Sequence, residues 1–251
     1  MFDPMSFKKI RFLNSGEVVE SLFDLNTDGD ILLVDWVVIC RKRNLSENFI
    51  RKYIKFMNAG DISRYQRLTE DFMVELGDRL DWIMLSIKQE LSESFIRKNK
   101  DKLGFRYISS HQNLSEDFIR EFENEVDWIG ISGNIELSEK FIIEFQDKVD
   151  WRYISYKQVL TEEFMRKFKN KLEWRNISAK QLMFDEFIIE NSDKIDFSLY
   201  FTYQSANFNI IKKYVHKTKF KDIVEFKTKR LTDIQKQEIQ KLLNLKYLFT
   251  K

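Results

Sequence analysis

The sequence is poor in the residues on which several protein classes depend. It contains one Cys, two His, one Pro and seven Gly among 251 residues. A single Cys excludes a disulfide scaffold and a cysteine-based zinc site. Two His leave little for His-dependent catalysis or a multi-His metal centre. Few Gly and Pro argue against a sandwich or barrel with many tight turns.

Targeting signals and long apolar runs are also missing. Residues 1–9 lack the apolar region and the small-residue cleavage site of a signal peptide. The strongest apolar run, residues 31–40, is interrupted by Asp35, whereas a membrane-spanning helix needs about 20 apolar residues. We therefore expect no membrane contact. The lone Cys40 in this run is typical of a reduced, cytoplasmic protein.

Apolar material is plentiful, because 43% of the residues are hydrophobic and 15% are aromatic. That share excludes a disordered chain. The formal net charge of +2 is unevenly distributed, with +8 over residues 206–251 and −6 over residues 1–205.

A 23-residue unit is repeated in tandem along most of the chain. It reads L-[ST]-E-x-F-[IM]-x-x-F-x-x-x-[LV]-D-W-x-x-I-S-x-x-Q-x, and its copies begin at Leu45, Leu68, Leu91, Leu114, Leu137 and Leu160. Incomplete units flank these copies on both sides, as expected when end repeats must face water. The repeat therefore decides the fold class.

One unit, residues 137–159, shows what each copy forms. Its apolar positions share one helical face in the first half, after a capping Ser138, and again in the second half, after a capping Asp150. The spacing predicts helices of about ten and eight residues, too short to be stable alone. We expect an all-α fold, an α/α solenoid of stacked helix pairs. The alternative is a leucine-rich-like coil with a strand at Trp-x-x-Ile, but its Asn ladder is absent.

The repeat unit resembles a known class. Over residues 31–204 the chain is similar to the tandem LSEDFI…VDWxxISxxQ repeats of uncharacterised proteins from large DNA viruses and tailed phages. The resemblance implies a viral or phage origin and an interaction role, and it brings no catalytic residues. It also implies a location in the host-cell cytoplasm or in the virion.

The flanking segments predict two caps around the solenoid of residues 31–205. Residues 1–30 form the N-terminal cap, in which apolar stretches around Asn14-Ser15-Gly16 indicate a β-hairpin. Residues 206–251 form a basic C-terminal cap. Thr232 and Gln235 have capping-box spacing there, and a closing helix follows with an apolar stripe made of Ile234, Ile239, Leu242, Leu243 and Tyr247.

One segment has the spacing of a calcium-binding loop. Oxygen ligands at alternate positions and a Gly at position six suit calcium, and the candidate ligands are Asp24, Asn26, Asp28, Asp30 and Asp35. However, the repeat already explains Asp35, and the usual Glu at position twelve is absent. We favour an ordinary turn before the first repeat helix, and hence no metal.

Catalytic motifs are lacking. His111 and His216 have no plausible Ser or Cys partner, and no Gly-rich phosphate loop occurs. The recurrent Asp and Trp are better explained as helix caps and core residues than as an acid/base pair or base-stacking groups. We expect neither an enzyme nor a cofactor.

The variable positions of the second helices are the best candidate site. Equivalent positions align along one surface of a solenoid, and Arg and Tyr are enriched at interface hot spots. We predict that a protein partner binds Arg64, Tyr65, Arg106, Tyr107, His111, Arg152, Tyr153, Tyr156, Arg175 and Asn176. An ordinary solvated helix face is equally compatible with these residues. The alternative function is nucleic-acid binding through Lys212, Lys213, Lys217, Lys219 and Lys221.

Overall fold

The protein is described by a computed structural model, which covers residues 18–20, 34–218 and 232–249. The chain divides into two compact units, Met1–Gly130 and Ile131–Lys251. Each unit is a stack of short helices. The predicted cap boundaries after residues 30 and 205 stay a prediction.

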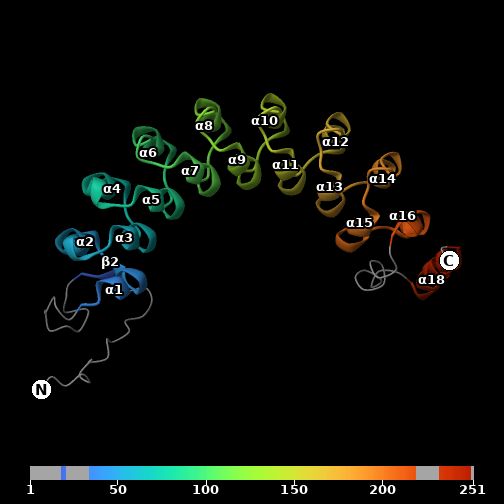
Figure 1. Ribbon diagram of the computed structural model, residues 1–251, viewed down its shortest axis with the longest axis horizontal. Coiled ribbons are helices and arrows are strands. Elements are labelled where there is room, and N and C mark those ends of the chain that lie inside the picture. Colours follow the sequence, from blue (N-terminus) through green and yellow to red (C-terminus); the bar gives the residue numbers. More distant parts are fainter. Residues whose placement is uncertain (1–17, 21–33, 219–231, 250–251) are drawn as a thin grey trace, which may run out of the picture. The chain divides into compact units, whose positions relative to one another are not determined.

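The first unit contains two layers of helices (Figure 1). The first helices of the repeats form one layer, with α2 (Glu47–Tyr53), α4 (Glu70–Leu76), α6 (Glu93–Lys98) and α8 (Glu116–Glu121). The second helices form the other, with α1 (Trp36–Lys42), α3 (Ala59–Tyr65), α5 (Trp82–Lys88) and α7 (Phe105–His111). Neighbours within the second-helix layer pack directly, α1 on α3, α3 on α5 and α5 on α7. Two 3-10 turns, η3 (Ile54–Phe56) and η4 (Gly77–Arg79), follow α2 and α4.

The second unit repeats this arrangement. Its first helices are α10 (Glu139–Glu144), α12 (Glu162–Lys167), α14 (Asp185–Glu190) and α16 (Phe208–Tyr214). Its second helices are α11 (Trp151–Lys157), α13 (Trp174–Lys180) and α15 (Phe197–Tyr203), and α13 packs on both of its neighbours. Helix α9 (Trp128–Asn134) spans the boundary between the units, and η5 (Val215–Lys217) precedes α18 (Asp233–Phe249).

These elements confirm the predicted all-α solenoid of helix pairs. The Trp-x-x-Ile segments are helical in every described repeat, so the leucine-rich-like alternative is wrong. Phe118, Phe141 and Phe164 occupy equivalent buried places, each one turn after a Ser or Thr whose hydroxyl accepts its backbone N–H. The repeated Phe therefore anchors each first helix in the core.

The first helices are shorter than expected. In the repeat at residues 137–159 the helix ends at Glu144, so Val149 is buried but lies beyond a turn and not on the helix face. The following Trp stabilises this turn, because the Trp151 indole N–H donates to the carbonyl of Gln146 (2.9 Å). Its ring stacks on Phe164 of the next repeat, with centroids 6.2 Å apart. Trp thus serves packing, in agreement with its predicted core role.

The predicted helix caps are confirmed. Ser138 caps α10 through its hydroxyl, and Asp150 accepts two backbone N–H groups at the start of α11. Asp35 likewise accepts the N–H of Val38 at 3.0 Å. Such caps satisfy donors that a helix start would otherwise leave unpaired.

The chain ends are described only in part. Val18–Val19 (β1) pairs in parallel with Asn44–Leu45 (β2), whereas the remainder of the expected hairpin, with Asn14-Ser15-Gly16, lies outside the described residues. At the other end, Thr232 and Gln235 form the predicted capping box. Ile239 is buried and Leu242 is half-buried, but Ile234 is exposed, so that part of the stripe is wrong. The side chains of Leu243 and Tyr247 lie outside the described part.

Cys40 offers a direct probe of the first repeat. The thiol is fully buried, and burial, followed by the charge of Asp61, raises its pKa to about 11. We expect thiol reagents at pH 8 to modify the native chain at least about a hundredfold more slowly than the urea-unfolded chain, because burial removes both access and thiolate. Timed labelling with mass spectrometry measures this ratio. Equal rates would contradict the buried position.

Candidate interaction surface

The recurrent Gln bonds one repeat to the preceding one. In the central example, the Gln112 amide donates to the carbonyls of Ser86 (2.9 Å) and Gln89 (2.8 Å), and its oxygen accepts the N–H of Leu91 (3.0 Å). The same three bonds recur at Gln66, Gln89, Gln158 and Gln181. The repeat pattern contains this Gln but does not by itself predict its role. A polar residue that recurs in register with the core positions indicates such a role, since a buried amide needs hydrogen-bond partners.

The recurrent Ser joins the same repeats from within the second helix. The buried Ser86 hydroxyl donates to the carbonyl of Trp82 (2.8 Å) and accepts the N–H of Gly104 in the next repeat (3.1 Å). Equivalent bonds run from Asp127 to Ser109, and from Glu173 to Ser155. This Ser therefore helps to join neighbouring repeats.

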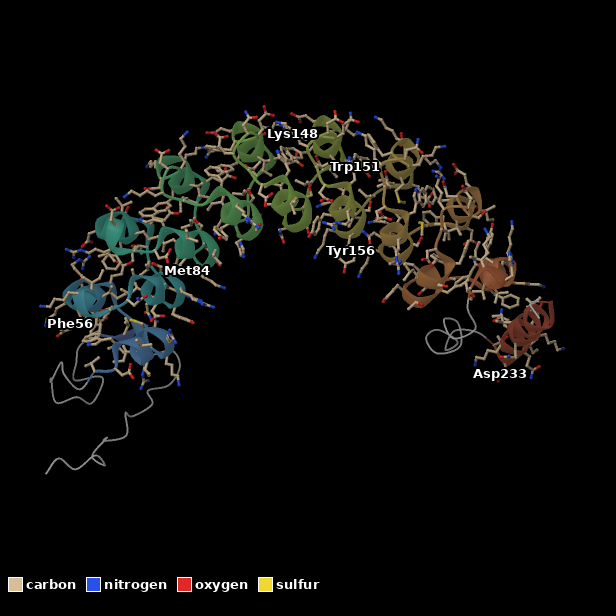
Figure 2. The ribbon with its side chains drawn as sticks, viewed as in Figure 1. Phe56, Met84, Lys148, Trp151, Tyr156 and Asp233 are labelled. Carbon is tan, nitrogen blue, oxygen red and sulfur yellow. The ribbon has the colours of Figure 1, made fainter. Side chains whose placement is uncertain are left out.

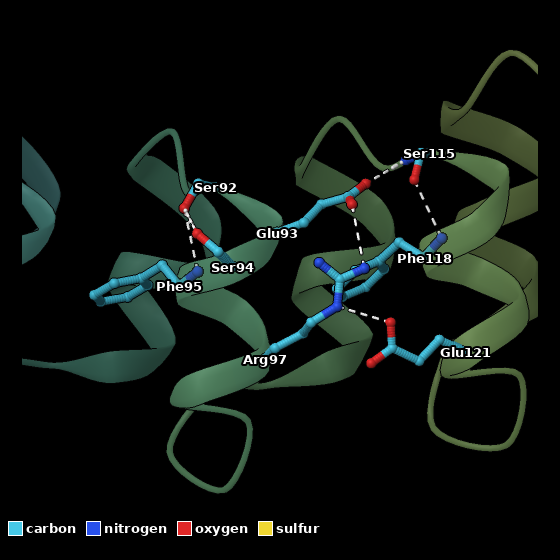
Figure 3. Close-up of polar contacts among 8 residues, drawn as sticks. All are labelled: Ser92, Glu93, Ser94, Phe95, Arg97, Ser115, Phe118 and Glu121. Atoms are coloured by element: carbon cyan, nitrogen blue, oxygen red, sulfur yellow. Dashed lines mark hydrogen bonds and ion pairs between the residues drawn. The ribbon is translucent and has the colours of Figure 1, made fainter.

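A third set of bonds connects the first helices (Figure 3). The Glu93 carboxylate accepts the N–H of Ser115, the cap of the next first helix, at 2.7 Å. Arg97 bridges Glu93 (3.4 Å) and Glu121 of the next repeat (2.7 Å), and the hydrogen bond to Glu121 raises the pKa of Arg97. The recurrent polar residues are thus engaged in hydrogen bonds and ion pairs within the fold.

In the second unit, the predicted residues lie on α11 and α13. Arg152, Tyr156 and Arg175 are exposed, whereas Tyr153 and Asn176 are half-buried. The Asn176 amide donates to the carbonyl of Arg152 (3.1 Å), which gives it a role in packing the two helices. Figure 2 shows Tyr156 pointing away from the first-helix layer. The structure thus brings three of the five predicted side chains to the surface.

In the first unit, the predicted residues lie on α3 and α7. Arg64, Tyr65, Arg106 and His111 are exposed, and Tyr107 is half-buried. The Arg64 guanidinium lies 5.3 Å from the Tyr65 ring centroid, and the His111 Nδ1 lies 3.1 Å from the carbonyl oxygen of Tyr107.

An open hollow of about 460 Å³ lies at the ends of α3 and α5. It is lined by Arg64, Tyr65, Arg67, Lys88 and Glu90. Three cationic side chains and one carboxylate surround it, so the hollow favours an anionic group.

The two helix layers differ in how their cations are paired. Every Arg within a described first helix forms an ion pair, and the pairs include Arg51–Glu75 (2.6 Å) and Arg166–Glu190 (2.8 Å). The hydrogen bond from Arg51 lowers the pKa of Glu75. Within the second helices α1 to α15, Asp61 is the sole acidic residue, and Arg41 pairs with it.

Most of the remaining cations of the second helices form no ion pair with a described carboxylate. Arg152 has one carboxylate within 4.0 Å among the described residues, that of the cap Asp150 at 3.7 Å. The other cations have no described carboxylate within 4.0 Å, namely Arg64, Arg106, Arg175, Lys42, Lys88, Lys157 and Lys180. This layer therefore carries positive charge that few carboxylates balance.

The basic C-terminal segment is partly engaged in packing. The Lys212 ammonium pairs with Glu238 of α18 at 2.5 Å. Lys217 donates to the carbonyl of Ser192 (2.7 Å) and lies 5.5 Å from the Phe197 ring centroid. Lys213 is exposed beside the Tyr214 ring, and Lys219 and Lys221 lie outside the described residues. Two of the three described lysines thus make polar contacts within the fold.

The calcium-loop residues Asp24, Asn26, Asp28 and Asp30 lie outside the described part of the chain. Asp35, the twelfth position, is the cap of α1. Within the described ranges, no cluster of His, Cys, Asp or Glu has the geometry to hold a metal ion.

Comparison with protein-family models, with curated proteins and with solved structures gives no match for this chain. No helix in the described ranges is both long and apolar enough to cross a bilayer.

Proposed function

We propose that the protein is a non-enzymatic repeat scaffold that binds another protein through the exposed face of its second helices. The unpaired cations of this face, next to exposed Tyr side chains, carry the proposal. The viral resemblance of the repeat makes a host factor or a virion component the expected partner, and the host cytoplasm or the virion the expected location.

The distribution of charge supports a role in binding. Surface ion pairs contribute little stability, yet the first helices pair all their Arg residues while the second helices leave most of theirs open. Arg and Tyr supply large, partly apolar contact area together with directed hydrogen bonds, which is why they dominate interface hot spots. A solenoid presents such positions as an extended row.

Charge reversal of this face tests the proposal. We expect the triple variant Arg106→Glu, Arg152→Glu and Arg175→Glu to lose at least about 90% of protein adducts formed by a photo-crosslinker at Tyr156 in host-cell extract, because each reversal repels an acidic partner group. A matched control reverses Lys98, Lys140 and Lys167, which are exposed on the first helices. Adduct yields that fall equally in both variants, or in neither, would contradict the proposal.

The same experiment covers the alternative function. The net charge of +8 over residues 206–251 favours contact with nucleic acid. Adducts with nucleic acid that disappear on charge reversal of Lys217, Lys219 and Lys221 would support a nucleic-acid-associated protein instead.

A further inference from the structure

We infer that the second-helix face of the second unit binds an acidic, extended polypeptide segment that also carries apolar side chains. The inference rests on the proposed function and specifies its partner. The surface in question, called the α11–α15 face, consists of Arg152, Tyr156, Lys157, Val159, Arg175, Lys180, Leu182 and Tyr203.

Charge is the first argument for an acidic partner. Helices α11, α13 and α15 contain no Asp or Glu, while α11 and α13 each present an Arg and a Lys to solvent. Three carboxylates stand at the helix starts. Asp150 and Asp196 accept backbone N–H groups, whereas the exposed Glu173 makes no such bond at the start of α13. An acidic segment would therefore find cations on two successive helices, with little repulsion between them.

The aromatic side chains arrange these cations in a row. The Lys180 ammonium lies 4.8 Å from the Tyr156 ring centroid and 6.0 Å from that of Tyr203. It thus sits between exposed rings of the two neighbouring helices. The Lys157 ammonium lies 5.5 Å from the Tyr156 ring centroid. These cation–π contacts position the ammonium groups without neutralising them.

Exposed apolar residues decide between a polypeptide and a nucleic acid. Val159 and Leu182 are 94% and 85% exposed, directly beyond the ends of α11 and α13. In the first unit, the position equivalent to Val159 and Leu182 is polar, namely Arg67, Glu90 and Asn113. Phosphates gain nothing from such an apolar edge, whereas apolar side chains of a peptide would remove it from water.

The helix spacing sets the pattern of the expected segment. Packed helices lie about 8–10 Å apart, and an extended chain advances about 3.3 Å per residue. A segment that crosses the helices would place roughly every third residue over a Lys. The expected ligand therefore has a carboxylate at about every third position and apolar side chains between.

Fluorescence anisotropy with the full chain tests this inference. The probe is a labelled peptide of about twelve residues with Glu at every third position and Leu and Ser between. Two control probes are the same peptide with Gln for Glu, and an oligothymidylate of similar charge. We expect the Glu peptide to bind at least about tenfold more tightly than either control, with an affinity that falls as salt rises.

Paired variants locate the binding. Lys157→Gln with Lys180→Gln, and separately Val159→Ser with Leu182→Ser, should each weaken the Glu peptide at least about tenfold. Lys140→Gln with Lys167→Gln, on the first helices of the same unit, should leave it unchanged. All of these side chains are exposed, and an unchanged melting temperature verifies the fold.

Three results would overturn the inference. They are tighter binding of the Gln peptide or of the oligonucleotide, equal affinity in all three variants, or no peptide binding at all. If Tyr156 still crosslinks to a protein in extract while the Glu peptide fails to bind, the proposed function stands and the acidic partner is wrong. If both fail, the proposed function falls as well.

Discussion

Replacing Phe118 with alanine is expected to lower the free energy of unfolding by about 3–5 kcal/mol. The ring is fully buried and packs on Phe122, with centroids 4.6 Å apart, and beneath the Arg97 guanidinium. The substitution removes apolar contact and leaves a cavity that a short helix, held on both sides by its neighbours, can fill only in part. Urea unfolding followed by circular dichroism measures the loss.

The exposed Phe184 provides the control for this substitution. Because its side chain is 76% exposed, Phe184→Ala should change the free energy of unfolding by only about 0.5 kcal/mol or less. Similar losses for the two alanine variants would show that Phe118 does not occupy the core. Since each repeat contacts mainly its neighbours, we also expect Phe118→Ala to broaden the unfolding transition by weakening the coupling between repeats.

Gln112→Met is expected to cost about 3 kcal/mol or more, although methionine has a similar volume. The amide satisfies three backbone groups, the carbonyls of Ser86 and Gln89 and the N–H of Leu91. A buried group left without its partner loses its hydration without compensation. Gln112→Glu should cost at least as much at neutral pH, because a carboxylate cannot donate to the two carbonyls.

Gln204 occupies the same position of a later repeat and is a matched control. It is half-buried and makes a single bond, to the carbonyl of Ala179 (2.8 Å). Gln204→Met should therefore cost about 1 kcal/mol, the net value of one hydrogen bond. Equal losses of unfolding free energy at the two positions in chemical denaturation would mean that the recurrent Gln side chains do not hold the repeats together.

The candidate site could be anticipated only in part. The register of the repeat places Arg152 and Arg175 at one variable position, and both are exposed. The same register does not reveal that Asn176 is used in helix packing or that Val159 and Leu182 form an exposed apolar edge. Exposure depends on which neighbours cover a residue, and a single-repeat pattern does not contain that information.

The sequence by itself determined the 23-residue period, the helix pairs, their caps and the buried Phe of each unit. These features depend on interactions within about four residues, such as Phe141 after the capping Ser138. The sequence pattern predicted a first helix that is too long, because Val149 continues the apolar spacing past the turn that Trp151 closes.

Only the tertiary structure decided which polar residues join the repeats and which remain exposed at the surface. The Gln112 amide forms hydrogen bonds with backbone groups that lie 21, 23 and 26 residues away along the chain. Arg97 pairs with Glu121, which lies 24 residues away. Such partners come together only when one repeat is stacked on the next. Most second-helix cations stay without an ion pair, because stacking aligns their positions with one another and places almost no carboxylate among them.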